Sequence, residues 1–164
     1  MKTLLILRHA KAVPKAPTIS DHDRPLDELG SDDALRMGEL IKDKDIVPCL
    51  IISSTAIRAK KTAEFVAKGC GYEDDIVLDD SIYQAKPKDY LDKVGTLSDR
   101  HNIVLIVGHN PTIEETIQML TDSSDVAMPS CALAHFSLQI EKWSDFSKAK
   151  TKQRVVVLND IVQP

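Results

Sequence analysis

The chain has 164 residues, of which 21 are Lys or Arg and 25 are Asp or Glu, so its formal net charge is −4. This length predicts one domain, spanning residues 1–164, that buries enough surface to form a core without disulfide or metal staples. The acidic balance argues against a dedicated nucleic-acid-binding protein, because such proteins carry a basic surface. An aromatic content of 4% also leaves few side chains for stacking on bases.

Cysteine usage and the N-terminal segment both favour a cytoplasmic protein. The three cysteines form no CxxC pair, which argues against a disulfide framework and against a zinc ribbon. The apolar run of residues 3–7 is followed by Arg8 and His9, so it is too short for a signal peptide or a membrane span. We therefore expect no association with membranes, and a monomer as the default oligomeric state.

Apolar stretches of strand length alternate along the chain with stretches of helical periodicity. Continuous apolar runs are typical of strands covered on both faces, whereas the alternation within residues 131–140 is typical of antiparallel strands at a sheet edge. The pattern predicts an α/β fold, a three-layer α/β/α sandwich with a mostly parallel central sheet and an antiparallel edge strand. The predicted strands are residues 3–7, 49–53, 76–78, 103–107, 131–140 and 154–158, and the predicted helices are residues 31–44, 55–69, 87–97 and 111–120.

Helix-capping residues and one long loop complete this outline. Ser31 is the expected N-cap of the first helix, and Gly69 is the expected end of the second. Residues 12–30 include a long loop rich in proline and charge. A loop of that length in a compact domain is often functional.

Three of the predicted strands end in polar residues that a buried sheet does not need. The first ends in Arg8 and His9, and the second leads through two serines to Arg58. The third is followed by His109. Ligands of open α/β sheets bind beyond the carboxyl ends of the strands, so we expect these residues to face one crevice if the three strands are neighbours.

The residues at these strand ends favour an anionic ligand. Arg58 falls in the first turn of a predicted helix, where a cation is unfavourable unless an anion binds between it and the helix N-terminus. His109 also precedes a helix start, where backbone N–H groups favour anions. Two arginines, two histidines and two helix N-termini together predict a site for a dianion the size of phosphate.

Other chemistries are less well supported by the pattern. The histidines lack HxxH or HxxxH spacing, so we expect no metal and no other cofactor. His22, His101 and His135 are expected to be structural. Two consecutive serines near a histidine would suit a serine hydrolase, but the GxSxG motif of such enzymes is missing.

The segments that carry these residues resemble the histidine phosphatase superfamily. Residues 8–10 (RHA) resemble its Arg-His-Gly signature, residues 53–63 (SSTAIRAKKTA) its second motif and residues 107–112 (VGHNPT) its third. In chain order, LRHAKA, DRPLDELG, SIYQA, GHNPT and MPSCALAHF are together similar to the SixA-type protein phosphohistidine phosphatases. The resemblance implies a phosphoglycerate mutase-like fold and a catalytic set of Arg8, His9, Arg58 and His109.

The resemblance also implies a mechanism. A neutral His9 would attack phosphorus and become a phosphohistidine, which water then hydrolyses, while the other three residues hold the phosphoryl oxygens. His109 would be protonated in the substrate complex, so the environments of the two histidines should separate their pKa values. Lys11 and Arg24 are further candidates for substrate binding at the rim, although Arg24 is as well suited to pairing with Asp21 or Asp23.

Two positions depart from the superfamily pattern. Ala10 replaces the usual glycine of the signature, as is common in the SixA-like branch. By alignment, Gln84 in SIYQA takes the place of a glutamate that protonates the leaving oxygen in many members, which makes Gln84 a candidate substrate contact but not an acid. A phosphohistidine needs no such acid, because solvent can protonate its leaving imidazole. Asp79 or Asp80 could supply a proton instead.

These features predict a phosphatase that hydrolyses phosphohistidine on a histidine-phosphotransfer protein. The short segment between Arg58 and His109 leaves little room for a lid, which also favours a protein substrate over a small metabolite. The nearest alternative is a phosphatase of the same superfamily acting on a small phosphorylated molecule. A non-catalytic phospho-binding module is a further alternative, which the intact His9 disfavours.

Overall fold

The computed structural model describes residues 1–146 and 156–164. In the second of these segments, side chains are described from Asp160 onward. Six strands form one sheet in the order β3-β2-β4-β1-β5-β6. The strands are β1 (Lys2–Arg8), β2 (Leu50–Ser54), β3 (Val77–Asp79), β4 (Ile103–Gly108), β5 (Leu133–Leu138) and β6 (Val156–Val162). Strands β3, β2, β4 and β1 pair in parallel, and β5 runs antiparallel to both of its neighbours.

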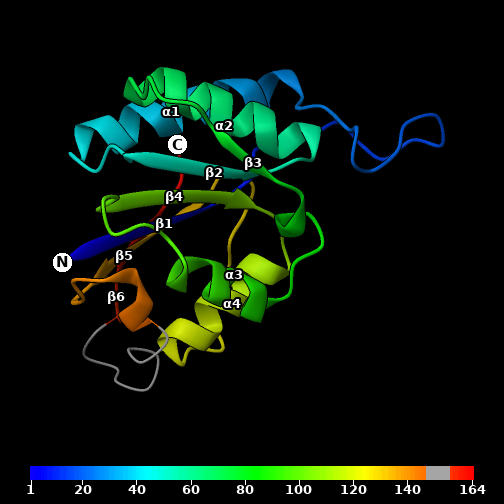
Figure 1. The fold of residues 1–164 in the computed structure, drawn as a ribbon. Coiled ribbons are helices and arrows are strands. Elements are labelled where there is room, and N and C mark those ends of the chain that lie inside the picture. Colours follow the sequence, from blue (N-terminus) through cyan, green and yellow to red (C-terminus); the bar gives the residue numbers. More distant parts are fainter. Residues whose placement is uncertain (147–155) are drawn as a thin grey trace.

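Helices cover the sheet on both faces (Figure 1). One face carries α1 (Glu28–Asp43) and α2 (Ile57–Cys70), and the other carries α3 (Pro87–Gly95) and α4 (Thr112–Thr121). Two short 3₁₀ helices complete the elements: η1 (Asp80–Ile82) precedes α3, and η2 (Trp143–Asp145) follows β5. The predicted three-layer α/β/α sandwich is therefore confirmed.

Strand β1 shows why the core forms on both sides of the sheet. Leu4 and Ile6 pack into the apolar cluster that contains residues of α3 and α4. Leu5 and Leu7 point the other way, into the cluster that contains residues of α1 and α2. Successive side chains of a strand point to opposite faces, so an unbroken apolar run fits a strand covered by helices on both sides.

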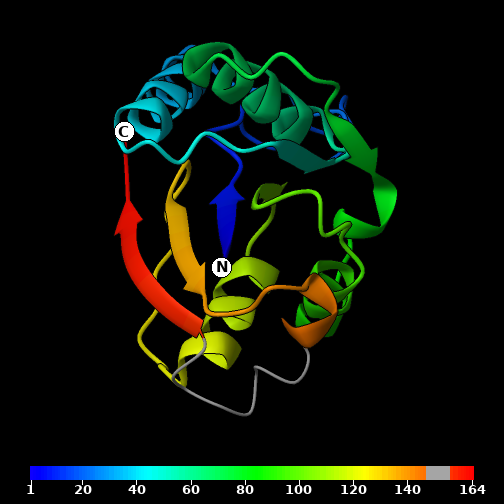
Figure 2. The same ribbon diagram turned by 60° about the vertical axis from the view of Figure 1, so that its left-hand side comes forward.

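The antiparallel strand lies one position in from the sheet edge. β5 pairs with β1 on one side and with β6 on the other, and β6 forms the edge (Figure 2). The predicted strand over residues 154–158 corresponds to the start of β6, and its first two residues lie outside the described part of the chain.

Two helix boundaries differ from the sequence prediction. α1 begins after Asp27, whose carboxylate accepts a hydrogen bond from the Gly30 N–H at 2.7 Å, so the N-cap is Asp27 and not Ser31. Gly69 lies inside α2, where an added Cβ would come within 2.4 Å of the Leu35 carbonyl oxygen on α1. Its smallness allows the two helices to approach, and α2 ends instead at Gly71 with φ of 76°.

The sheet order places the three polar strand ends side by side, because β2, β4 and β1 are neighbours and parallel. The chain after β1 leaves the same end of the sheet and extends outward before it reaches α1 (Figure 1). Among the described helices, none is both long and apolar enough to cross a membrane.

Candidate active site

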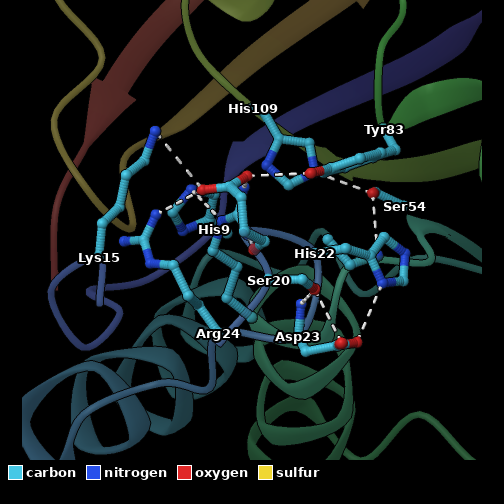
Figure 3. A network of polar contacts seen from close by, with 12 residues as sticks. His9, Lys15, Ser20, His22, Asp23, Arg24, Ser54, Tyr83 and His109 are labelled. Atoms are coloured by element: carbon cyan, nitrogen blue, oxygen red, sulfur yellow. Dashed lines mark hydrogen bonds and ion pairs between the residues drawn. The ribbon is translucent and has the colours of Figure 1, made fainter. Parts of the chain in front are cut away.

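Two histidines and an arginine from different strand ends meet beyond the sheet. The rings of His9 and His109 lie 5.1 Å apart between centroids. Arg58, in the first turn of α2, donates from Nε to His9 Nε2 at 3.2 Å. Figure 3 shows the rings of His9 and His109 beside each other, with Tyr83 and Arg24 turned toward the same space.

The main chain and the ring of His9 are both fixed. Its N–H donates to the Gly108 carbonyl at 3.0 Å, and its own carbonyl accepts from the Cys131 N–H at 3.2 Å. The ring nitrogen Nδ1 lies 2.7 Å from the Ala10 carbonyl oxygen, which can only accept, so Nδ1 carries the proton. Nε2 therefore presents a lone pair toward Arg58 and is free of a proton.

Burial keeps the His9 ring neutral at physiological pH. Desolvation, together with the nearby guanidinium groups of Arg58 and Arg8, lowers the pKa of His9 to about 4 against the opposing bond to Ala10. A neutral imidazole is the form that can attack phosphorus.

His109 is also neutral in the ligand-free protein. Desolvation, followed by the proximity of His9 and Arg58, lowers the pKa of His109 to about 3. Burial and shared cations act on both rings and do not separate the two pKa values by themselves, so the separation expected in the substrate complex stays a prediction. A bound dianion would favour protonation of His109.

Ser54 holds the His109 ring from one side. Its hydroxyl lies 2.8 Å from His109 Nε2 and also accepts from the Ala56 N–H at 3.2 Å. The other nitrogen, His109 Nδ1, is buried and has no hydrogen-bond partner within the described residues.

Gly108 lets the chain pass over a buried tyrosine before His109. An added Cβ at Gly108 would lie 1.7 Å from the Tyr90 hydroxyl oxygen of α3. Only glycine therefore fits at the end of β4, where the chain turns toward the site.

Arg8 lies beside His9 but is anchored to a different loop. Its Nη1 donates to the Met128 carbonyl at 2.9 Å, and the Asn110 side-chain amide donates to the same oxygen at 3.0 Å. Burial lowers the pKa of Arg8, while Glu114 opposes that shift. Arg8 Nε is buried and has no partner in the part of the chain that the structure describes.

The carboxylate of Asp21, on the loop between β1 and α1, occupies the cationic side of the site. Asp21 Oδ2 accepts from Arg58 Nη2 at 3.0 Å and from the Tyr83 hydroxyl at 3.0 Å. Asp21 Oδ1 accepts from Arg24 Nη1 at 2.8 Å, and Lys15 Nζ lies 3.7 Å away. These partners, Arg24 first, hold the pKa of the Asp21 carboxyl well below its usual range. Asp21 thus gives Arg58 a counter-charge from within the protein.

Within the described residues, no group of three or more His, Cys, Asp and Glu side chains is arranged to hold a metal ion. The site instead combines guanidinium donors with two neutral imidazoles. That combination suits transfer of an anionic group to His9.

A protein-family comparison matches residues 4–86 to the histidine phosphatase superfamily (branch 1). The matched half of the chain includes Arg8, His9 and Arg58. The chain belongs to the histidine phosphatase superfamily.

Relatives of this histidine phosphatase agree with the SixA-type resemblance. The chain is 32% identical over 122 residues to an uncharacterised protein of Mycobacterium leprae, and this match covers 71% of this chain and 72% of the relative. The crystal structure of the putative phosphohistidine phosphatase SixA from Agrobacterium tumefaciens superposes with a TM-score of 0.83 at 29% identity, over 99% of this chain and 98% of that one.

Two more distant structures share the fold. The protein histidine phosphatase SixA complexed with tungstate has a TM-score of 0.82 at 19% identity, over 99% of this chain and 97% of that one. A mycobacterial glucosyl-3-phosphoglycerate phosphatase has a TM-score of 0.64 at 16% identity, over 84% of this chain and 93% of that one. Proteins named for different substrates therefore share this phosphoglycerate mutase-like fold.

The remaining candidates from the sequence have separate positions in this histidine phosphatase. Arg24 does pair with Asp21, and through that carboxylate it joins the cationic side of the site. Lys11 is more than half exposed, and its ammonium lies 3.4 Å from the carboxylate of Asp27 at the start of α1. Gln84 is exposed, so the residue that faces the site from this segment is its neighbour, Tyr83.

Sequence patterns missed Asp21 and Tyr83 and undervalued His22. The Tyr83 ring meets the edges of His109 and His22, with centroids 5.6 and 4.9 Å away. His22 Nε2 lies 3.0 Å from the Thr55 hydroxyl, so it is a neighbour of the site as well as a structural residue. The charge cluster around Asp21 and Arg24 was a visible signal, but the sequence could not show that it folds back onto Arg58.

Proposed function

We propose that this histidine phosphatase hydrolyses phosphohistidine on a protein, and that a histidine-phosphotransfer domain is the substrate. The observation that carries the proposal is the ionised state of the carboxyl group that touches the site. Asp21 is held as a carboxylate by Arg24, Tyr83 and Arg58, so it has no proton to give. A substrate that needs no protein acid is therefore favoured.

Other carboxyl groups near this segment have structural partners. Although burial opposes the shift, Lys93 and Ser81 lower the pKa of Asp79. Asp80 accepts a hydrogen bond from the Thr55 hydroxyl at 2.8 Å. Asp79 is therefore kept ionised and Asp80 is engaged by Thr55, which supports phosphoramidate over alkyl phosphate chemistry.

The proposed reaction has two displacement steps. His9 Nε2 attacks phosphorus in line, the phosphorus–nitrogen bond of the substrate breaks, and the leaving imidazole takes its proton from solvent. Water then attacks the phosphorus on His9, which releases inorganic phosphate and restores the neutral ring. Arg8, Arg58 and His109 are proposed to hold the phosphoryl oxygens and to stabilise the charge that spreads over them.

The chain segment between Arg58 and His109 supports a protein substrate. It is taken up by the rest of α2, by β3, η1 and α3, and by β4, all of which belong to the sandwich itself. No separate lid segment is left in this interval, so a side chain displayed on another domain could approach His9. The SixA-type neighbours, one of them named a protein histidine phosphatase, support the same substrate class.

A small phosphorylated molecule is the second candidate substrate. Tyr83 favours it, because burial and Asp21 raise the pKa of its phenol, which stays protonated and could donate to a leaving oxygen if its hydroxyl turned away from Asp21. A phenol with a raised pKa is a poor acid, however, so alkyl phosphates should react slowly.

The deciding experiment compares three substrates with one enzyme preparation: a phosphohistidine-bearing phosphotransfer domain, a sugar phosphate and an aryl phosphate. We expect kcat/KM for the phosphohistidine to exceed that for the sugar phosphate by at least about 100-fold, the scale of a missing general acid. The aryl phosphate, whose leaving group needs no acid, should also turn over. If the sugar phosphate reacts as fast as the phosphohistidine, the protein is a small-molecule phosphatase. If the aryl phosphate does not turn over at all, the protein is a binding module.

We propose further that residues 1–164 act as one domain in a reducing, cytoplasmic compartment. Cys49, Cys70 and Cys131 are free thiols in the structure, which suits such a compartment. One cooperative unfolding transition, unaffected by dithiothreitol, is expected. Two separate transitions, or a loss of stability on reduction, would contradict this part of the proposal.

A further inference from the structure

Arg58 contacts Asp21 twice, through one whole end of its guanidinium group. Arg58 Nη1 donates to the Asp21 carbonyl oxygen at 2.5 Å, and Arg58 Nη2 donates to the Asp21 carboxylate at 3.0 Å. We propose that Asp21 is a positioning residue, which holds Arg58 so that its Nε–H is aimed at His9 Nε2. The proposal rests on His9 as the nucleophile of the proposed function, but not on phosphohistidine as the substrate.

The donors of Arg58 are divided between two partners. The Nη1 and Nη2 end of the guanidinium faces Asp21, whereas the Nε side faces the nucleophilic nitrogen of His9. A guanidinium carries five N–H donors in a rigid plane, so fixing one end fixes the direction of the other. A phosphoryl group on His9 Nε2 would meet the Nε side, which Asp21 leaves open.

Asp21 is itself held in place by Arg24 of its own loop and by Tyr83 from a distant part of the chain. Arg24 donates to one carboxylate oxygen at 2.8 Å and also donates from Nε to the Val13 carbonyl at 3.0 Å. Tyr83, the residue directly after η1, donates from its hydroxyl to the other carboxylate oxygen of Asp21. The loop position of Asp21 is therefore fixed by the body of the protein.

The burial of the Arg58 side chain explains why a carboxylate lies beside it. The Arg58 side chain is only 7% exposed, and a buried cation is costly without a counter-charge. Arginine also has many rotamers, and locking one in advance removes an entropy cost from the reaction. A neighbouring carboxylate that stays in place during catalysis meets both needs.

The alternative is that Asp21 is an internal competitor, which occupies the phosphate position and must leave before substrate binds. The contacts favour positioning, because Asp21 and the nucleophile lie on different sides of the same guanidinium. The two roles predict opposite effects on activity, so kinetics distinguish them.

The test is a double-mutant cycle with Asp21→Asn and Arg58→Ala, assayed with p-nitrophenyl phosphate. Asp21→Asn should lower kcat about 100-fold, the scale of a small misplacement of a catalytic group, with KM unchanged or lower. In the Arg58→Ala background the same change should cost less than about 3-fold, because its effect acts through Arg58. The matched control is Asp23→Asn, an exposed carboxylate of the same loop that contacts Ser20 and His22.

Two results would overturn the proposal. An equal loss in both backgrounds would show that Asp21 does not act through Arg58. A higher kcat/KM in Asp21→Asn, with tighter inhibition by inorganic phosphate, would make Asp21 an internal competitor. If the Asn variant does not fold by circular dichroism, the same cycle is run with Asp21→Ser.

Failure of the proposed function gives a different pattern. If the wild-type enzyme turns over p-nitrophenyl phosphate but not phosphohistidine, the proposed substrate is wrong. The double-mutant cycle can still be measured in that case, because it uses p-nitrophenyl phosphate. A wild-type enzyme that never places phosphate on His9 contradicts the proposed mechanism before any Asp21 variant is compared.

Discussion

The strand ends and the loop of residues 12–27 build the same site in different ways. His9, Ser54 and His109 come from neighbouring parallel strands or directly follow them, and the main chain of His9 is bonded on both sides. The loop contributes Asp21, whose carboxylate is 37% exposed and is held by side chains alone. The strands thus fix where the reacting atoms lie, and the loop sets the charge around them.

Removing the proposed nucleophile should have the largest effect. His9 belongs to the strand-end half of the site, by which we mean the residues at or directly after the ends of the parallel strands, as opposed to the loop half formed by residues 12–27. His9→Ala is expected to abolish turnover of aryl phosphate and to prevent ³²P from becoming attached to the protein in an acid-labile, alkali-stable form. The matched control is His101→Ala, a histidine that precedes β4 at the opposite end from His109. Turnover at the wild-type rate in His9→Ala would rule out the mechanism.

Arg58 belongs to both halves, since it contacts His9 and Asp21. Arg58→Ala should lose about 3 kcal/mol of transition-state stabilisation, the scale of one lost oxyanion donor, which corresponds to a fall of more than 100-fold in kcat/KM. Arg58→Lys should recover only part of this, because an ammonium cannot contact Asp21 and His9 with opposite sides of one plane. Full activity in the lysine variant would show that charge alone matters and that the guanidinium geometry does not.

The strand-end half was predictable from the sequence, for a physical reason. Unbroken apolar runs mark strands covered on both faces, and polar residues directly after such runs fall at a defined edge of the sheet. Arg8, His9, Arg58 and His109 are tied to strands or helix starts in this way. Their chemistry and their convergence follow from local patterns plus the sheet order.

The loop half was not predictable in the same way. The partners of Asp21 lie 37 and 62 positions away at Arg58 and Tyr83, and no local pattern specifies such contacts. The same limit applies to Tyr83, the neighbour of Gln84, because its contact with Asp21 depends on an irregular turn that no local pattern specifies. The first helix boundary failed similarly, since Asp27 and Ser31 are both good N-caps and the structure uses the earlier one.

Arg24 probes the loop half with a smaller expected effect. Arg24→Ala removes the largest contribution to the low pKa of Asp21 and one of its hydrogen bonds, yet leaves the contact between Asp21 and Arg58. We expect kcat/KM for aryl phosphate to fall about 10-fold, as for loss of a supporting contact around a fixed ligand. Arg36→Ala, an exposed arginine of α1, is the matched control. An effect as large as that of Arg58→Ala would mean that Arg24 contacts the phosphoryl group itself.

The strand-end histidines should also couple stability to pH. In the unfolded chain each titrates near pH 6.5, whereas folding lowers the pKa of His9 to about 4 and that of His109 to about 3. Between those values the unfolded state binds more protons, so the free energy of unfolding rises with pH and falls on acidification below pH 6.5. From pH 7 to pH 5 each buried ring should cost roughly 1–2 kcal/mol. Urea unfolding at both pH values should show a smaller loss in His9→Ala than in the wild type. An equal loss in the two proteins would mean that His9 is already charged or solvated, and the strand ends would then not provide the neutral nucleophile that the mechanism needs.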